Sequence, residues 1–174
     1  MKTQASSSAP FVILALFSWG LTATPLFGQS RVLSAADLTN QADVVAVGKV
    51  SATKSEWNAD KTRIVTRVTV AVSEFLKGGG DPQMSIITPG GEIGEAGEMY
   101  FGAPRFAENE HVVVFVKGGP NRQYRVAGGA QGKITVTQDA TTGVMMAGAA
   151  VKLDELVSNV KSATQALRPE EQKR

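Results

Sequence analysis

The strongest constraint on the fold is a run of alternating apolar and polar residues between positions 63 and 73. Successive side chains of a β-strand point to opposite faces, so this alternation predicts a long antiparallel strand with one face buried. The apolar face is expected to carry Ile64, Thr66, Val68, Val70 and Val72, and the polar face Arg63, Arg67, Thr69 and Ser73.

Five further strands are expected, one before this strand and four after it. Residues 112–116 are apolar throughout, which predicts a strand covered on both faces. Gly48 lies inside the first predicted strand, at residues 43–50, and indicates a β-bulge or a close approach of two backbones. Polar residues 54–61 are expected to form a hairpin loop, and residues 92–110 a long loop. The five strands are expected at residues 43–50, 83–88, 112–116, 123–126 and 133–137.

A helix is predicted at each end of these strands. Ser34 and Asp37 have the spacing of a capping box, in which each side chain bonds the backbone N–H of the other, and the helix should run to Gln41. The second helix follows from apolar residues at helical spacing and should stop before Pro169. Its apolar positions are Leu153, Leu156, Val157, Val160 and Leu167.

The predicted fold class is mainly β, namely a small closed antiparallel barrel of OB type with a short N-terminal and a longer C-terminal helix. The chain has no cysteine, so no disulfide can stabilise the fold and burial of apolar surface must do so. Closing the sheet removes exposed strand edges, which an exported protein without disulfides would otherwise have to protect.

The first 30 residues have the order of features of a secretory signal peptide. Lys2 precedes an apolar core at residues 11–17, and small residues with Pro25 follow. The alternative is an uncleaved membrane anchor, which needs roughly 20 apolar residues, whereas this run is interrupted from Ser18 onward. We therefore expect a signal peptide at 1–30, one domain at 31–168, a disordered tail at 169–174, and a secreted or periplasmic location.

The charge balance bears on the class of partner. Only Lys2 among the 18 lysines and arginines precedes residue 31, and all 16 acidic residues follow it. A nearly neutral domain argues against a nucleic-acid groove and against a polybasic membrane patch. We expect neither a nucleic-acid partner nor a stable membrane span after signal cleavage.

Several landmarks occur in the same order as in a known family. The matching segments are residues 42–45, 48–50, 75–78 and 112–116. They resemble the netrin-like module, an OB-type barrel with terminal helices that occurs in tissue inhibitors of metalloproteinases, and more closely uncharacterised bacterial secreted proteins of that pattern. Those inhibitors chelate zinc through an N-terminal cysteine. This chain has no cysteine, so no inhibitory residue can be carried over.

Two sets of residues are candidates for chemical sites. His111, the only histidine, could bind a metal or act as a base together with Glu108 and Glu110, but a lone histidine lacks the cluster that such sites require. The second set, Glu92, Glu95 and Glu98, could offer oxygen ligands to calcium, but without the spacing of a calcium loop. There is no nucleophile elbow. We expect no catalytic residues, no metal site, no cofactor and no enzymatic activity.

Aromatic residues are the candidates for partner binding. Tyr100, Phe101 and Phe106 lie within one long predicted loop, and aromatic side chains commonly anchor interfaces. The competing interpretation is that they fold back and close one end of the barrel. Trp57, in the predicted 54–61 loop, is a fourth candidate, and with Tyr124 it could stack a sugar or a base.

The leading functional hypothesis is a non-enzymatic interaction module that binds another exported protein, with proteases as one candidate class. A carbohydrate- or envelope-binding module is the alternative, and an unrecognised hydrolase the third hypothesis.

Signal cleavage gives the first testable prediction. The apolar core ends by about Leu21 and small residues follow, so the mature N-terminus should lie between residues 24 and 31. N-terminal sequencing of exported protein checks this. Recovery of the chain from membranes with Met1 intact would establish an anchor instead.

Overall fold

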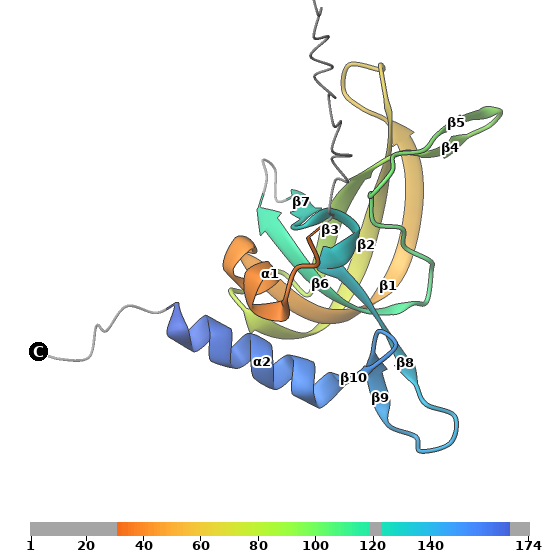
Figure 1. Cartoon of the computed structure of the whole chain (residues 1–174). Helices are drawn as coiled ribbons and strands as arrows, with labels where there is room; N and C mark the ends of the chain where they lie inside the picture. Colours follow the sequence, from red (N-terminus) through yellow and green to blue (C-terminus); the bar gives the residue numbers. More distant parts are fainter. Residues whose placement is uncertain (1–30, 119–122, 168–174) are drawn as a thin grey trace, which may run out of the picture. The chain divides into compact units, whose positions relative to one another are not determined.

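The computed structural model describes residues 31–118 and 123–167 (Figure 1). These residues belong to one compact unit, Arg31–Arg174. The predicted signal peptide at 1–30 and tail at 169–174 lie outside the described residues.

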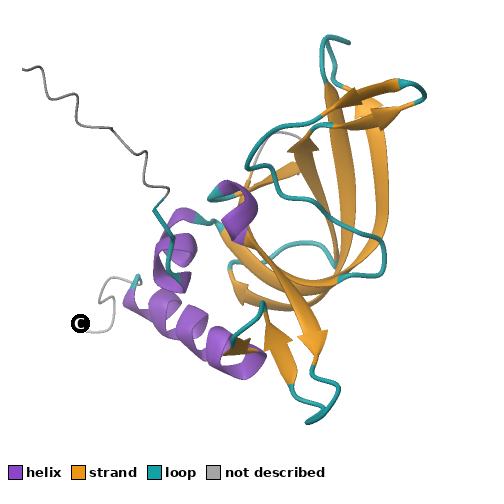
Figure 2. Ribbon diagram, turned by 45° about the vertical axis from the view of Figure 1, so that its right-hand side comes forward, coloured by secondary structure: helices purple, strands orange, loops and turns teal. Residues whose placement is uncertain are grey.

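The protein is mainly β, with two helices and one large sheet (Figure 2). Helix α1 (Ala35–Gln41) precedes the strands and α2 (Leu153–Ala166) follows them. Among the described residues the large sheet comprises β1 (Val44–Trp57), β2 (Ile64–Lys77), β3 (Gln83–Pro89), β6 (His111–Gly118), β7 (Gln123–Val126), β8 (Lys133–Gln138), β9 (Met145–Ala147) and β10 (Val151–Lys152). A separate hairpin consists of β4 (Gly91–Ile93) and β5 (Ala96–Glu98), and a 3-10 helix, η2 (Gly129–Gly132), precedes β8.

The strand order is β1-β2-β3-β7-β6-β8-β9-β10, and β1 also pairs with β6. Following the pairings from β1 through β2, β3, β7 and β6 therefore leads back to β1. All of these pairings are antiparallel except that of β3 with β7, which is parallel and involves Ser85 and Ile86. All six strands predicted from the sequence are present.

Two apolar cores lie on opposite faces of the sheet. One is enclosed by the strands and contains Val50, Val68, Val70 and Ile86. The other lies between the sheet and the two helices. β6 contributes to both, because Val112, Val114 and Val116 face the first core whereas Val113 and Phe115 face the second. Covering on both faces explains why residues 112–116 are apolar throughout.

The predictions for Gly48 and for the first helix are confirmed. A Cβ on Gly48 would lie 2.5 Å from the carbonyl oxygen of Ala71, and the β1–β2 register shifts between Val47 and Gly48. The capping box is also present, since Ser34 Oγ accepts from the N–H of Asp37 at 3.1 Å and the carboxylate of Asp37 accepts from the N–H of Ser34 at 3.1 Å. Both contacts are local, which is why the sequence alone indicated them.

The prediction for residues 54–61 needs a correction, because β1 is bulged at Ser51 and then continues as a strand. Val50 pairs with Val70 and Ala52 with Thr69, so Ser51 is an extra residue on β1. The extra residue reverses the faces of the strand beyond it. The predicted hairpin loop was wrong in its first half, because β1 continues to Trp57 and the turn begins only at Asn58.

Three other details differ from the sequence predictions. The predicted loop at 92–110 contains most of the β4–β5 hairpin, which turns at Gly94 with a φ of 59°. The short strands β9 and β10 had no recognisable pattern. Leu167 follows the end of α2 and is exposed, whereas Leu156 and Val160 on the same helix are buried. None of the described helices is both long and apolar enough to cross a membrane.

The enclosed core gives a prediction of stability. Val70 is fully buried on the inner face of β2, whereas Thr69 lies on the outer face. Val70→Ala should lower the free energy of unfolding by about 1–3 kcal/mol through lost burial and a residual cavity. Thr69→Ala is the matched control and should lower the free energy of unfolding by less than Val70→Ala does. Urea midpoints decide this, and a larger effect at Thr69 would contradict the observed register.

Candidate functional site

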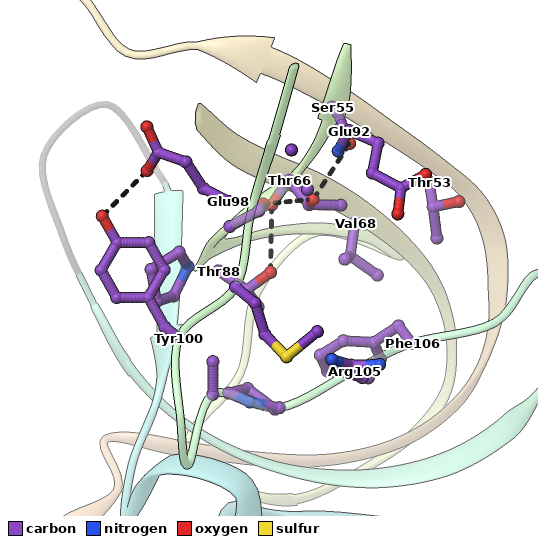
Figure 3. Close-up of a pocket in the computed structure, with 17 residues that line it drawn as sticks. Thr53, Ser55, Thr66, Val68, Thr88, Glu92, Glu98, Tyr100, Arg105 and Phe106 are labelled. Atoms are coloured by element: carbon purple, nitrogen blue, oxygen red, sulfur yellow. Dashed lines mark hydrogen bonds between the residues drawn. The ribbon is translucent and has the colours of Figure 1, made fainter. Parts of the chain in front are cut away.

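A pocket of about 580 Å³ lies between the inner face of β1, β2 and β3 and the chain segment 89–106 (Figure 3). This volume falls in the range of small-molecule and side-chain sites. The strand side of the pocket carries Thr53, Ser55, Thr66, Val68 and Thr88. The opposing segment includes Glu92, Glu98, Met99, Tyr100, Pro104, Arg105 and Phe106.

The floor of the pocket is a row of hydroxyl groups on three neighbouring strands. Ser55 pairs with Thr66, and Thr66 pairs with Thr88. Deeper in the same face the side chains are apolar, because Val68 and Ile86 belong to the enclosed core. The inner face thus changes from apolar to hydroxyl-bearing at one level of the sheet, where the core gives way to the pocket.

The hydrogen bonds of this row run in one order, from the N–H of Glu92 to Ser55, from Ser55 to Thr66, and from Thr66 to Gly90. The N–H of Glu92 donates to Ser55 Oγ at 3.2 Å, and Thr66 Oγ1 donates to the carbonyl oxygen of Gly90 at 2.7 Å. Ser55 Oγ and Thr66 Oγ1 are 3.3 Å apart. A hydroxyl has one proton to donate, and that of Thr66 is used on Gly90, so Ser55 must donate to Thr66. These bonds dock the β4–β5 hairpin onto β1 and β2.

The segment over the pocket is held at several points. Tyr100 accepts a hydrogen bond from Arg63 at 2.9 Å and donates one to Glu98 at 2.9 Å. The carbonyl oxygen of Gly102 accepts from the N–H of Ala130 in η2 at 2.9 Å. Pro104 is buried. The backbone of the segment is therefore fixed to the sheet on one side and to η2 on the other.

An ion pair anchors the end of this segment. The carboxylate of Glu110 accepts hydrogen bonds from Lys133 Nζ, from Thr135 Oγ1 at 2.6 Å, and from the N–H of Ala107 at 3.1 Å. The Lys133 ammonium lies 5.6 Å from the centre of the Phe106 ring, within cation–π range. Burial raises the pKa of Glu110, but these hydrogen bonds and the charge of Lys133 outweigh it and hold the pKa below its usual value.

The predicted aromatic residues do not form one cluster. Phe106 packs against the enclosed core, as the competing interpretation expected. Tyr100 is half-buried at the edge of the pocket. Phe101 is fully exposed, and Met99, two residues before it in the sequence, is 78% exposed. Phe106 therefore belongs to the core, Tyr100 is held by hydrogen bonds, and Phe101 faces the solvent.

Trp57 and Tyr124 are placed at different levels of the sheet. Trp57 is 45% exposed and pairs with Ile64 at the start of β2. Tyr124 pairs with Ile86, which in turn pairs with Val68, four residues farther along β2. Nothing in this register favours a shared stacking site for a sugar.

Two of the acidic residues near His111 are bonded to other groups of the fold. Glu110 is engaged by Lys133 and Thr135, and Glu108 accepts from the N–H of Thr53 at 3.1 Å. His111 is exposed at the start of β6. Within residues 31–118 and 123–167, no group of three or more His, Cys, Asp or Glu side chains is arranged to hold a metal ion.

The hydroxyl row is not predictable from periodicity alone. The alternation places Thr66 on the buried face of its strand, whereas Ser55 falls in a predicted loop and Thr88 has no predicted role. The signal that could have found the row is the presence of small hydroxyl residues where the apolar pattern of three predicted strands ends. Only the strand register shows that they share one level.

Comparison with known proteins adds no family assignment. No protein-family model matches this sequence, and no curated protein is significantly similar to it.

The Glu110 network predicts a dependence of stability on pH. The pKa of Glu110 is lower in the folded protein than in the unfolded chain, so its ionised form stabilises the fold. This stabilisation is complete above the unfolded-chain pKa of about 4.3 and disappears as the pH falls through the lower folded-state pKa. The stability difference between the natural protein and Glu110→Gln should therefore be constant near neutral pH and shrink in acid.

Urea unfolding over a range of pH measures this difference. Glu95→Gln, in the exposed turn of the β4–β5 hairpin, is the control and should change stability little at any pH. A Glu110→Gln difference that grows as the pH falls would show that the carboxylate destabilises the fold.

Proposed function

We propose that this protein is an exported, non-enzymatic interaction module that binds another exported protein through the segment 99–106 and the pocket beneath it. Proteases are one candidate class of partner. The proposal rests chiefly on two large apolar side chains, Met99 and Phe101, that are held in solvent on a well-anchored segment.

The pairings of the large sheet support a barrel interpretation. Because β1 pairs with both β2 and β6, and β3 with β7, we infer a closed barrel of OB type formed by β1, β2, β3, β7 and β6. The flanking positions of α1 and α2 agree with the netrin-like resemblance. Barrels of this kind commonly bind their targets through loops and one open face, and segment 99–106 is such a loop.

The exposed apolar pair supports a protein partner. Exposing Phe101 to water is unfavourable, and burial of its ring in a partner would recover that free energy. The neighbouring residues hold the backbone in place, through the bonds of Tyr100 and the contact of Gly102 with Ala130. A fixed backbone means that little conformational entropy is lost on binding, which is typical of an interface anchor.

Phe101→Ala tests the proposal. The immobilised protein is used to retain proteins from the exported fraction of the source organism, and affinity for the retained protein is then measured with purified variants. We expect Phe101→Ala to weaken binding by about 1 kcal/mol or more, with the melting temperature nearly unchanged because the ring is fully exposed.

Two variants serve as controls. Leu167→Ala removes an exposed apolar side chain after α2 and should leave binding intact. Phe106→Ala removes a side chain packed against the core and should lower stability. Binding that is unchanged by Phe101→Ala would rule out this segment as the interface.

A further inference from the structure

The hydroxyl row offers acceptors rather than donors to anything that enters the pocket. The protons of Ser55 and Thr66 are used on Thr66 and on Gly90, as argued above. Thr88 Oγ1 contacts the carbonyl oxygen of Thr66 at 3.5 Å and can direct its proton there. Each hydroxyl oxygen has two acceptor positions, and within the described residues each of these three accepts at most one hydrogen bond, although Thr88 itself is buried. A ligand that donates hydrogen bonds is therefore favoured.

Charged groups at the pocket favour a cationic donor. Glu92 and Glu98 line the pocket, and Glu108 bonds the backbone of Thr53 on its wall. The cationic groups are Arg105, which is exposed, Arg63, which is bonded to Tyr100 and so lies near Glu98, and Lys133, which lies over Phe106 and is paired with Glu110. Glu98 offsets Arg63 and Glu110 offsets Lys133, so two carboxylates, Glu92 and Glu108, remain against one cation, Arg105. An anionic ligand would meet unfavourable charge here.

The pocket also offers apolar surface that suits an alkyl chain. Val68 supplies it on the strand side, and Met99, Pro104 and Phe106 supply it on the opposing segment. Figure 3 shows Val68 and Phe106 in the same pocket as the hydroxyls of Thr66 and Thr88. A ligand with an apolar stem and a donating head would satisfy both walls. A lysine side chain has this form, with four methylene groups and an ammonium that carries three donors.

We propose that the pocket binds a primary ammonium group, with the ammonium on the Ser55–Thr66–Thr88 row and its alkyl stem against Met99 and Phe106. The compact ammonium suits single hydroxyl acceptors better than a guanidinium does, since the planar fork of arginine is matched to paired carboxylate oxygens. The source of the group that fits the proposed function is a lysine of the protein partner. That assignment rests on the proposed function, whereas the ammonium site itself does not.

The test uses small probes and the protein labelled with ¹⁵N. Nα-acetyl-lysine methylamide is titrated while NMR follows the backbone amides of Gly91 and Glu92, the latter of which donates to Ser55. The matched probe has its side-chain amine acetylated, which keeps the stem and removes the charge. We expect the charged probe to bind about tenfold more tightly than the acetylated one. Equal binding of the two probes, or no binding of either, would overturn the proposal.

Variants locate the site on the hydroxyl row. Thr66→Val keeps the shape of the side chain but removes the hydroxyl, and it should weaken the charged probe about tenfold. Thr69→Val makes the same change on the outer face of β2 and should have no effect. If Thr66→Val lowers the melting temperature strongly, Ser55→Ala and the exposed Glu92→Gln provide the same test. Loss of binding with Thr69→Val but not with Thr66→Val or Ser55→Ala would contradict the site.

A last comparison separates the two sources of the amine. Acetyl-Leu-Lys-Leu-amide represents a protein partner, and spermidine represents a free polyamine. If the partner is a protein, the peptide binds more tightly than spermidine and Phe101→Ala weakens only the peptide. Tighter binding of spermidine that is insensitive to Phe101→Ala would keep the ammonium site and reject the lysine source. Failure of all amine probes would reject this site and leave the Phe101 interface to be judged by its own experiment.

Discussion

Strand β1 is hydrogen-bonded along both of its edges, and most of the structure depends on this double pairing. It pairs with β2 along nearly its whole length and with β6 from Val44 to Lys49. β2 can approach β1 closely at Gly48 because Gly48 lacks a Cβ, which would otherwise collide with the carbonyl oxygen of Ala71. With β1 paired on both edges, one apolar core gathers residues of β1, β2, β3 and β6, and the other face of β6 is covered by α1 and α2. A chain without disulfides thus acquires two cores from one sheet.

The bulge at Ser51 explains why the inner face of β1 carries the core residue Val50 before the bulge and the pocket residues Thr53 and Ser55 after it. If Ser51 took part in the regular alternation instead of being bulged out, Lys54 and Glu56 would point inward beyond Val50, and a buried charge there would be costly. With the bulge, Thr53 and Ser55 point inward, and Ser55 aligns with Thr66 and Thr88 on the neighbouring strands. The bulge therefore decides that the inner face of β1 ends in hydroxyl residues rather than in charged ones.

The segment over the pocket combines a fixed backbone with exposed side chains. The Glu110–Lys133 pair and the packing of Phe106 hold its end, and the Gly102–Ala130 contact holds its middle. The exposure of Met99 and Phe101 is therefore a property of a held conformation rather than of a free loop. This combination links the fold to the proposed binding role, because recognition residues on a rigid scaffold lose little entropy when a partner binds.

The sequence by itself determined the elements whose signals are local. The alternation of residues 63–73, the apolar run at 112–116, the capping box at Ser34 and the spacing of Leu156 and Val160 each predicted an element that is present. Only the tertiary structure decided the direction of Ser55, the pairing of β3 with β7, and the separation of Phe101 from Phe106. The physical reason is that periodicity reports which face of one strand is apolar, whereas a bulge or a packing partner is fixed by contacts between residues far apart in the chain.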